Sequence, residues 1–361
     1  MGYQILVINP GATSTKVAWF EDDHKAFAEN LRHSDEELKS AGRVADQKPL
    51  RTRCVLTFLA ARGKRVSELS AIAARGGVLS SVPSGTFEVN QAMVDELSVA
   101  RRAEHASNLA ALIAFELGRP AGIKAYVTDP VSVDELYDVA RISGFPPIQR
   151  ESISHALNIR AAARRYAAAA GRPLRALDLV VCHLGTGVSA AALQQGRAID
   201  VINPRDEGPF AMDRAGALPI GPLMDHMAET RTDPRQLKQV LFGQAGMSAY
   251  LGTMDLLEVE RRIAAGDQRA DLLHDALAYQ TSKAIAEMCV VLEGRAEAIV
   301  LTGGMAKSAR LVERITRRVG FLAPVHLYPG EFEMEALALG ALRVLTGEEK
   351  CLAYPARVRA D

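Results

Sequence analysis

Short apolar runs alternate along the chain with longer segments in which apolar side chains recur at helical spacing. The short runs predict buried strands, and the longer periodic segments predict helices that pack on one face. We expect strands in residues 4–20 (a pair), 70–74, 124–128, 178–184, 190–193, 197–202, 298–301 and 325–328. We expect helices in residues 51–62, 91–117, 152–170, 234–242, 255–265, 269–293, 307–319 and 334–346.

Each half of the chain opens with an antiparallel strand pair and continues with alternating helices and strands. This order predicts an α/β protein whose sheets have mixed strand directions. A chain of 361 residues is long enough for about two domains. The segment Gly171-Arg172-Pro173 is a helix stop signal, so we place the boundary there. We expect an N-terminal lobe of residues 1–172, completed by the C-terminal helix within 334–361, and a C-terminal lobe of residues 173–333.

Composition excludes several classes of protein. The chain has 43 Lys plus Arg and 43 Asp plus Glu, so no basic excess favours a nucleic-acid partner. Its four cysteines are widely spaced and form no C-x-x-C pair, which disfavours a zinc or redox motif. No apolar run approaches the length of a membrane span, and no leader-type segment opens the chain, so we expect a cytoplasmic protein without a membrane partner.

The two strand pairs that open the halves share one pattern. The turn from Asn9 to Lys16 and the turn from His183 to Ser189 are both rich in Gly and hydroxyl residues. Glycine lets a backbone approach a ligand closely, and a tight turn can direct several N–H groups at one anion. Two such turns, with a third glycine-rich strand end at Thr302-Gly303-Gly304, suggest a duplicated protein that binds a nucleotide.

Two other phosphate-binding motifs, the dinucleotide fingerprint and the P-loop, fit the sequence less well. Residues Gly185–Ala190 match the dinucleotide fingerprint G-x-G-x-x-A, which requires a helix directly after the turn. The next turn, at Gln194-Gln195-Gly196, leaves too few residues for that helix, so a nicotinamide dehydrogenase is disfavoured. The chain contains no G-x-x-x-x-G-K-[ST], which disfavours a P-loop NTPase.

These turns, together with a set of short motifs in fixed order, resemble the acetate kinase and butyrate kinase family of the sugar kinase, Hsp70 and actin superfamily. The resemblance covers nearly the whole chain. The short length of the chain and the residues that make up its motifs favour the butyrate kinase branch. The further motifs are Ala74-Arg75-Gly76-Gly77, His105-Ala106-Ser107-Asn108, Thr128-Asp129-Pro130-Val131, Ser154-His155-Ala156-Leu157-Asn158, Glu207-Gly208-Pro209-Phe210, Asp213-Arg214-Ala215-Gly216 and Pro329-Gly330-Glu331.

The resemblance implies two duplicated ribonuclease H-like lobes, each a mixed five-stranded sheet flanked by helices, with a nucleotide cleft between them. It implies transfer of a phosphoryl group from ATP to a short-chain fatty acid, butanoate, with Mg²⁺ as cofactor and a homodimer or larger homo-oligomer as the assembly. A kinase of isobutyrate, propionate or acetate, and a nucleotide-binding member without acyl chemistry, remain alternatives.

The resemblance also implies roles for individual residues. The catalytic group would be Arg75, Asp129, His155 and Arg214. The nucleotide would contact Asn9, Thr13, Ser14, Thr15, Lys16, His183, Gly185, Thr186, Gly187, Gly303 and Gly304. The metal would be held by Asn9, Asp129 and Glu333, with Glu331 and Glu335 as alternatives to Glu333. His105 would support the site, and Val82, Pro83 and Phe210 would wall the acyl pocket.

Overall fold

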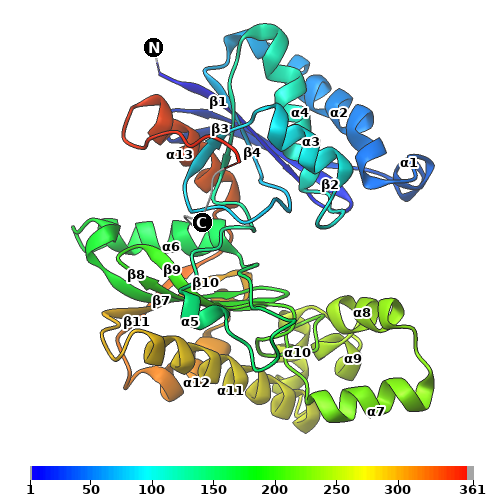
Figure 1. Cartoon of the computed structure of the whole chain (residues 1–361), viewed down its shortest axis with the longest axis vertical. Coiled ribbons are helices and arrows are strands. Elements are labelled where there is room, and N and C mark those ends of the chain that lie inside the picture. The colour runs from blue at the N-terminus through cyan, green and yellow to red at the C-terminus, as the bar shows by residue number, and fades with distance from the viewer. Residues whose placement is uncertain (1, 356–361) are drawn as a thin grey trace. The chain divides into compact units, whose positions relative to one another are not determined.

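A computed structural model describes residues 2–355, and the internal contacts divide the chain into two units (Figure 1). Unit 1 contains the residues up to Glu135 together with those from Phe332 onward, and unit 2 contains Leu136–Glu331. Within residues 2–355, no helix is long and apolar enough to cross a lipid bilayer.

Unit 1 is built on a six-stranded mixed sheet in the order β3-β2-β1-β4-β6-β5. Its strands are β1 (Gln4–Pro10), β2 (Ser14–Glu21), β3 (His24–Arg32), β4 (Ala71–Ala74), β5 (Thr86–Glu88) and β6 (Ala125–Thr128). The central pairs β1–β4 and β4–β6 are parallel, whereas β2, β3 and β5 join antiparallel to their neighbours. The parallel centre brings the ends of β1, β4 and β6 to one edge of the sheet.

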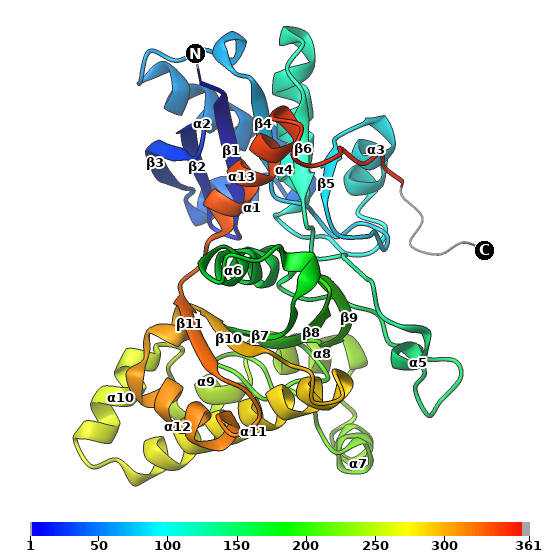
Figure 2. The ribbon, with the colours of Figure 1, turned by 90° about the vertical axis from the view of Figure 1, so that its left-hand side faces the viewer.

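Helices cover both faces of this sheet (Figure 2). The helices of unit 1 are α1 (Asp35–Ser40), α2 (Lys48–Ala60), α3 (Gln91–Val99), α4 (Asn108–Gly118) and α13 (Glu333–Leu345). Helix α4 packs on β1, β4 and β6 and carries α2 and α3 at its outer side, while α13 packs on the same three strands from the other face.

Unit 2 is built on a five-stranded mixed sheet in the order β11-β10-β7-β8-β9. Its strands are β7 (Asp178–Leu184), β8 (Val188–Gln194), β9 (Arg197–Ile202), β10 (Ala298–Gly303) and β11 (Val325–Pro329). Both faces are buried, and successive residues of β7 enter different cores: Val180 and Cys182 belong to one apolar cluster, Leu179 and Val181 to the other.

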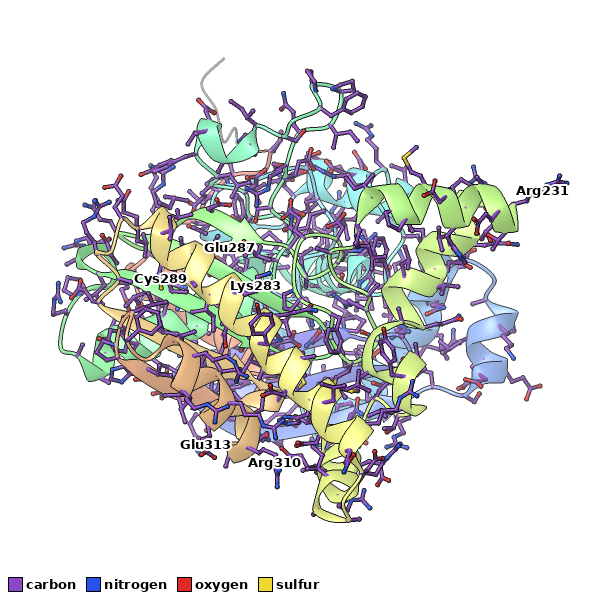
Figure 3. All side chains as sticks on the ribbon, turned by 90° about the horizontal axis from the view of Figure 1, so that it is seen from below. Arg231, Lys283, Glu287, Cys289, Arg310 and Glu313 are labelled. Carbon is purple, nitrogen blue, oxygen red and sulfur yellow. The ribbon has the colours of Figure 1, made fainter. Side chains whose placement is uncertain are left out.

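The helices of unit 2 are α5 (Asp138–Arg141), α6 (Ala156–Ala169), α7 (Ile220–Thr230), α8 (Pro234–Gly243), α9 (Gly246–Leu251), α10 (Leu256–Ala264), α11 (Gln268–Val291) and α12 (Ala309–Val319). Helices α11 and α12 lie side by side below the sheet, with Lys283, Glu287, Arg310 and Glu313 on their outer surfaces (Figure 3). Ion pairs join the two helices, Arg314 with Asp271 at 2.5 Å and Arg318 with Asp275 at 2.8 Å.

Helix α6 is placed differently from our expectation, which assigned residues up to 172 to the N-terminal lobe. Its apolar face, with Ile159, Ala162, Ala163 and Ala167, packs with β7 and β10 in one core of unit 2. The alanines allow the helix to approach the sheet closely. The stop signal at residues 171–173 therefore ends a helix without separating two units, and the division falls at Glu135–Leu136.

The single long helix that we expected over residues 91–117 is wrong. Helix α3 ends at Val99, where Ala100 adopts a left-handed conformation with φ 48°, and α4 begins at Asn108. The side-chain amide of Asn108 donates to the carbonyl of Ala103 and accepts from the N–H of Val78, which fixes the intervening turn. His105 consequently lies in an exposed turn and not within a helix.

The expected five-stranded sheet is correct for unit 2, while unit 1 has one strand more. The charged segment after Glu21 contains β3, an edge strand on which no residue is fully buried, so it lacks an apolar pattern. Strand β5 has only three residues, too few for a periodic signal.

Close packing of α13 on β6 provides a test of the fold of unit 1. A Cβ atom at Gly340 would lie 2.1 Å from the Thr128 hydroxyl oxygen, closer than atoms can approach. We expect Gly340→Ala to lower the free energy of unfolding by about 1–3 kcal/mol, as overpacked cores do. The control is Gly221→Ala in α7. A Cβ atom there would meet no atom within 4 Å outside the backbone of its own helix, and alanine has the higher helix propensity, so this substitution should be neutral or stabilising. Equal melting temperatures for the two variants would contradict the packing described.

Candidate functional site

The first hairpin turn joins β1 to β2 and exposes its tip. The N–H of Gly11 donates to the carbonyl of Ser14 at 2.7 Å, while Ala12 and Thr13 are exposed. Thr15 is fully buried, and its hydroxyl lies 2.9 Å from Nε2 of His33. Of the residues expected to contact a nucleotide here, Thr13 and Lys16 are therefore the accessible ones, and Thr15 faces the interior.

Three expected site residues meet at the edge of the sheet in unit 1. Asn9 is the last residue but one of β1, Arg75 follows β4, and Glu333 is the first residue of α13. Glu333 accepts from Asn9 Nδ2 at 2.8 Å and forms an ion pair with Arg75 Nη1 at 2.6 Å. Arg75 also donates to Asn9 Oδ1 at 3.4 Å. Sequence left three glutamates open as metal ligands; among them, Glu333 is the one that these contacts join to Asn9.

Asp129 follows β6 and is held in an uncommon backbone conformation. Its φ is 40°, which a residue with a side chain rarely adopts, and it is 1% exposed. Two hydrogen bonds to Gly85 support it, one from the Asp129 N–H at 2.9 Å and one to its carboxylate at 2.8 Å. Held strain of this kind is frequent at functional sites, but the carboxylate also serves the turn itself.

The second hairpin turn, between β7 and β8, packs against Arg214. A Cβ atom at Gly187 would lie 2.3 Å from Nη1 of Arg214, so only glycine allows the guanidinium to approach this closely. The N–H of Gly185 donates to the carbonyl of Gly187 at 3.2 Å, and the carbonyl of Thr186 accepts from Met212 at 3.2 Å. The side chain of Thr186 is exposed at the tip.

Most hydrogen-bonding capacity of Arg214 is not used within its unit. Its Nε lies 3.4 Å from Asp213 without a hydrogen bond, and Nη1 donates to the carbonyl of Pro204 at 3.3 Å. Among residues 2–355, Nη2 of Arg214 has no hydrogen-bond acceptor. Burial lowers the pKa of Arg214 and raises the pKa of Asp213, because each charge is partly removed from water. Glu207, the other carboxylate considered for Arg214, pairs with Arg150 at 2.9 Å.

Two histidines stack beside the second turn. The rings of His155 and His183 lie 3.9 Å apart at an angle of 15°. Nδ1 of His155 is 2.8 Å from the hydroxyl of Ser189, and Nδ1 of His183 is 2.9 Å from the amide of Asn158. Asn158 also donates to Thr302 at 3.1 Å, which links the histidines to the end of β10. These contacts fix both ring orientations.

The third glycine-rich strand end lies in the same unit. Gly303 has φ 93°, and a Cβ atom there would lie 2.3 Å from the carbonyl of Leu184 on β7. Gly303 and Gly330 exchange backbone hydrogen bonds of 3.1 and 2.9 Å, and the short helix η5 (Gly304–Lys307) follows. A cavity of about 680 Å³ borders η5, with walls that include Ala306, Val312, Leu327 and Pro329.

The expected supporting residues have mixed positions. His105 is exposed, with Nδ1 2.8 Å from the Ser107 hydroxyl. Val82 is buried and bridges to Val133 in unit 1, and Pro83 beside it is half-buried. Phe210 belongs to the larger core of unit 2. Their role as walls of an acyl pocket stays a prediction.

Sequence gave no role to Ser189 and Asn158, which orient the two histidines, or to Arg51, which lies fully buried behind the first turn. Ser189 ends the second glycine-rich turn, and Asn158 ends the motif that begins at Ser154, so both lie inside motifs described above. Arg51 is the first residue of the helix expected over residues 51–62, and only the folded structure distinguishes it from the other arginines of that helix. No group of three or more His, Cys, Asp or Glu side chains suited to a metal occurs within the part of the chain that the structure describes.

Comparison with known proteins places the chain in a family. The model of the acetokinase family matches residues 153–325. Probable butyrate kinase 1 of Thermotoga maritima is 48% identical over 352 residues, covering 98% of each chain. Butyrate kinase 1 of Clostridium acetobutylicum is 42% identical over 353 residues, covering 98% of this chain and 99% of its own.

Solved structures agree in fold. Acetate kinase from Porphyromonas gingivalis has a TM-score of 0.75 at 17% identity, covering 95% of this chain and all of its own. A propionate kinase from Francisella tularensis has the same TM-score at 16% identity, covering 94% and 98% of the two chains. From the extent of identity with the butyrate kinases, the chain belongs to the acetokinase family.

Proposed function

We propose that this protein transfers the γ-phosphoryl group of ATP to the carboxylate of a short-chain fatty acid, butanoate, giving butanoyl phosphate and ADP. The observation that carries the proposal is the 48% identity, over nearly the whole chain, to a protein named as a probable butyrate kinase. The arrangement of cations and glycine-rich turns within each unit supports it.

The chemistry needs cations more than it needs a base. A carboxylate is already ionised at neutral pH, so the nucleophile requires no deprotonation. Catalysis of phosphoryl transfer then consists of positioning and of neutralising charge on the transferring group. We propose that Arg75 orients the acid carboxylate and that Arg214 contacts the transferring phosphoryl. Guanidinium groups bind both kinds of oxygen in a two-pronged manner, and Arg214 keeps most of its N–H groups available.

The histidine pair supplies a fixed donor. Because Nδ1 of His155 faces Ser189, its Nε2 points the other way and is the ring atom that we assign to the phosphoryl oxygens. Direct in-line transfer suffices, so no phosphohistidine is required. We assign the nucleotide phosphates to the backbone of the two hairpin turns, and the adenosine to the strand end at Gly303 and Gly304.

The donor set of unit 1 fits Mg²⁺. Glu333 and Asp129 offer carboxylate oxygens, and Asn9, which contacts Glu333 through Nδ2, offers an amide oxygen. Magnesium prefers one or two carboxylates, with water and substrate phosphates completing its shell, so a small protein donor set is sufficient. When bound, the ion would neutralise phosphate charge. Glu333, Asn9 and Asp129 would hold it or its water molecules, and Arg75 restrains Glu333.

The preference for one chain length depends on the apolar pocket that receives the acyl tail. One methylene in an apolar pocket changes binding by only about 1–3 kcal/mol, so neighbouring acids are discriminated weakly. We keep Val82, Pro83 and Phe210 as the proposed determinants.

The proposed reaction is tested by trapping acyl phosphate with hydroxylamine. We expect ATP- and Mg²⁺-dependent formation of the hydroxamate with acids of two to six carbons, and the highest kcat/KM with butanoate. A maximum at propanoate or acetate would correct the acid and retain the reaction. Nucleotide binding without product from any acid would refute the kinase proposal.

The role of Arg214 is tested by its replacement. We expect Arg214→Ala to lower kcat about 10²- to 10³-fold, the usual cost of losing one transition-state donor, with a nearly unchanged melting temperature. Arg310→Ala removes an exposed arginine of the same unit (Figure 3) and should leave kcat unchanged. Loss of folding in Arg214→Ala would instead indicate that the arginine mainly balances the charge of Asp213.

The metal assignment is tested by two glutamates of one helix. We expect Glu333→Gln to raise the Mg²⁺ concentration for half-maximal activity at least about tenfold, because a carboxylate ligand becomes a neutral amide. Glu335→Gln is the control, since Glu335 lies 4.0 Å from Lys25 in a solvent-exposed pair. Equal Mg²⁺ requirements in both variants would remove Glu333 from the metal site.

A further inference from the structure

A fully buried arginine lies behind the first hairpin turn. Arg51 projects from α2 and is 0% exposed. Its Nη1 donates to the carbonyls of Gly11 and Ser14, at 3.0 and 2.9 Å, and to the Thr15 hydroxyl at 3.1 Å. Its Nη2 donates to the carbonyl of Ala12 at 3.1 Å. One side chain therefore contacts four of the five residues from Gly11 to Thr15, all except Thr13.

Arg51 is itself held in place by a neutral group. Gln47 Oε1 accepts from Nε at 3.2 Å and from Nη2 at 2.8 Å. Within residues 2–355, no carboxylate pairs with Arg51. Arg150 differs, because both Asp200 and Glu207 pair with it. Burying a charge without an opposite charge is costly, so an unpaired buried guanidinium calls for an explanation.

The contacts of Arg51 also determine which way the turn presents its donors. In a trans peptide, the C=O of one residue and the N–H of the next point in opposite directions. The carbonyls of Gly11 and Ala12 point at Arg51, so the N–H groups of Ala12 and Thr13 point away from it, at the exposed tip. Backbone N–H groups arranged in this way form a concave site for an anion.

We propose that Arg51 is a positioning residue for the nucleotide phosphates: it fixes the turn at residues 11–14 with the N–H groups of Ala12 and Thr13 outward, and its charge is balanced by the phosphate that the turn binds. The inference rests on the proposed function, because it assigns this turn to phosphate. Arg51 does not touch the nucleotide and acts through the backbone. The charged guanidinium below the turn and the outward N–H groups above it both favour an anion at the same place.

The test separates phosphate binding from general stability. We would measure the Kd of ADP and of adenosine by calorimetry, and the KM of ATP and of butanoate, for Arg51→Lys and Arg51→Met. Arg51→Lys keeps the charge and loses the planar fork, whereas Arg51→Met loses both. Arg53→Met, an exposed position of the same helix, is the matched control.

We expect Arg51→Lys to raise the Kd of ADP and the KM of ATP about tenfold, equivalent to one charge-assisted hydrogen bond, and Arg51→Met to raise them further. The Kd of adenosine and the KM of butanoate should change less than about twofold, because neither ligand carries phosphate. Arg53→Met should match the unmodified protein in all four constants.

A second variant covers the case in which Arg51 substitutions unfold the chain. Gln47→Met retains Arg51 but removes the acceptor that orients it, so the Kd of ADP should rise while adenosine binding is retained. Unchanged ADP binding in folded Arg51→Lys or Gln47→Met would overturn the inference, as would equal loss for ADP, adenosine and butanoate. Failure of the unmodified protein to bind ADP would instead refute the proposed function.

Discussion

A guanidinium group packed against a hairpin turn, fully buried for Arg51 and half-buried for Arg214, is the interaction on which both proposed phosphate sites depend. In unit 1, Arg51 lies behind the turn, and all of its donors are used within the protein. In unit 2, Arg214 lies on Gly187, and its one hydrogen bond within the described residues 2–355 is to the carbonyl of Pro204 at 3.3 Å. The same chemical group therefore shapes a turn in one unit, and in the other it retains donors for a ligand.

This difference follows from how each guanidinium is satisfied. A fully hydrogen-bonded arginine fixes its surroundings, because moving it would leave several buried donors unsatisfied. An arginine with unused donors in a partly buried place gains more from an incoming anion than one in water, since the local dielectric is lower. Arg75 is intermediate: its ion pair with Glu333 is 2.6 Å long, and both side chains remain partly exposed. A bound carboxylate would compete with Glu333 for the same guanidinium.

Sequence predicted the parts of the fold that repeat apolar or glycine-rich patterns. The two hairpins, β10 and the helices α11 to α13 follow from such patterns, because both sheets are buried on two faces. The exposed edge strand β3 and the break between α3 and α4 do not, since the first lacks an apolar period and the second depends on Asn108 bonding to distant backbone. That α6 belongs to unit 2 also follows only from tertiary packing, because its apolar face packs on the sheet of that unit.

The site residues divide in the same way. Motifs indicated Asn9, Arg75, Arg214 and His155, and left Glu333 open with Glu331 and Glu335. The structure brings Asn9 and Arg75 together with Glu333 and orients His155 through Ser189. No motif marks Arg51, because a single arginine at the start of a helix is ordinarily a surface residue. Its burial is a property of the sheet and helix that enclose it, and no local pattern encodes that property.

The two hairpins have similar backbones and differ chemically at one side-chain position. Asn9 and His183 occupy equivalent places, each one residue before the end of the first hairpin strand and paired across to the second. Asn9 directs an amide to Glu333, whereas His183 stacks on His155. The proposal assigns phosphate to the backbone of the turn in both units, so the backbone does not distinguish the two turns. A single side-chain position per hairpin gives one turn a carboxylate neighbour suited to a cation and the other an imidazole neighbour suited to an anion.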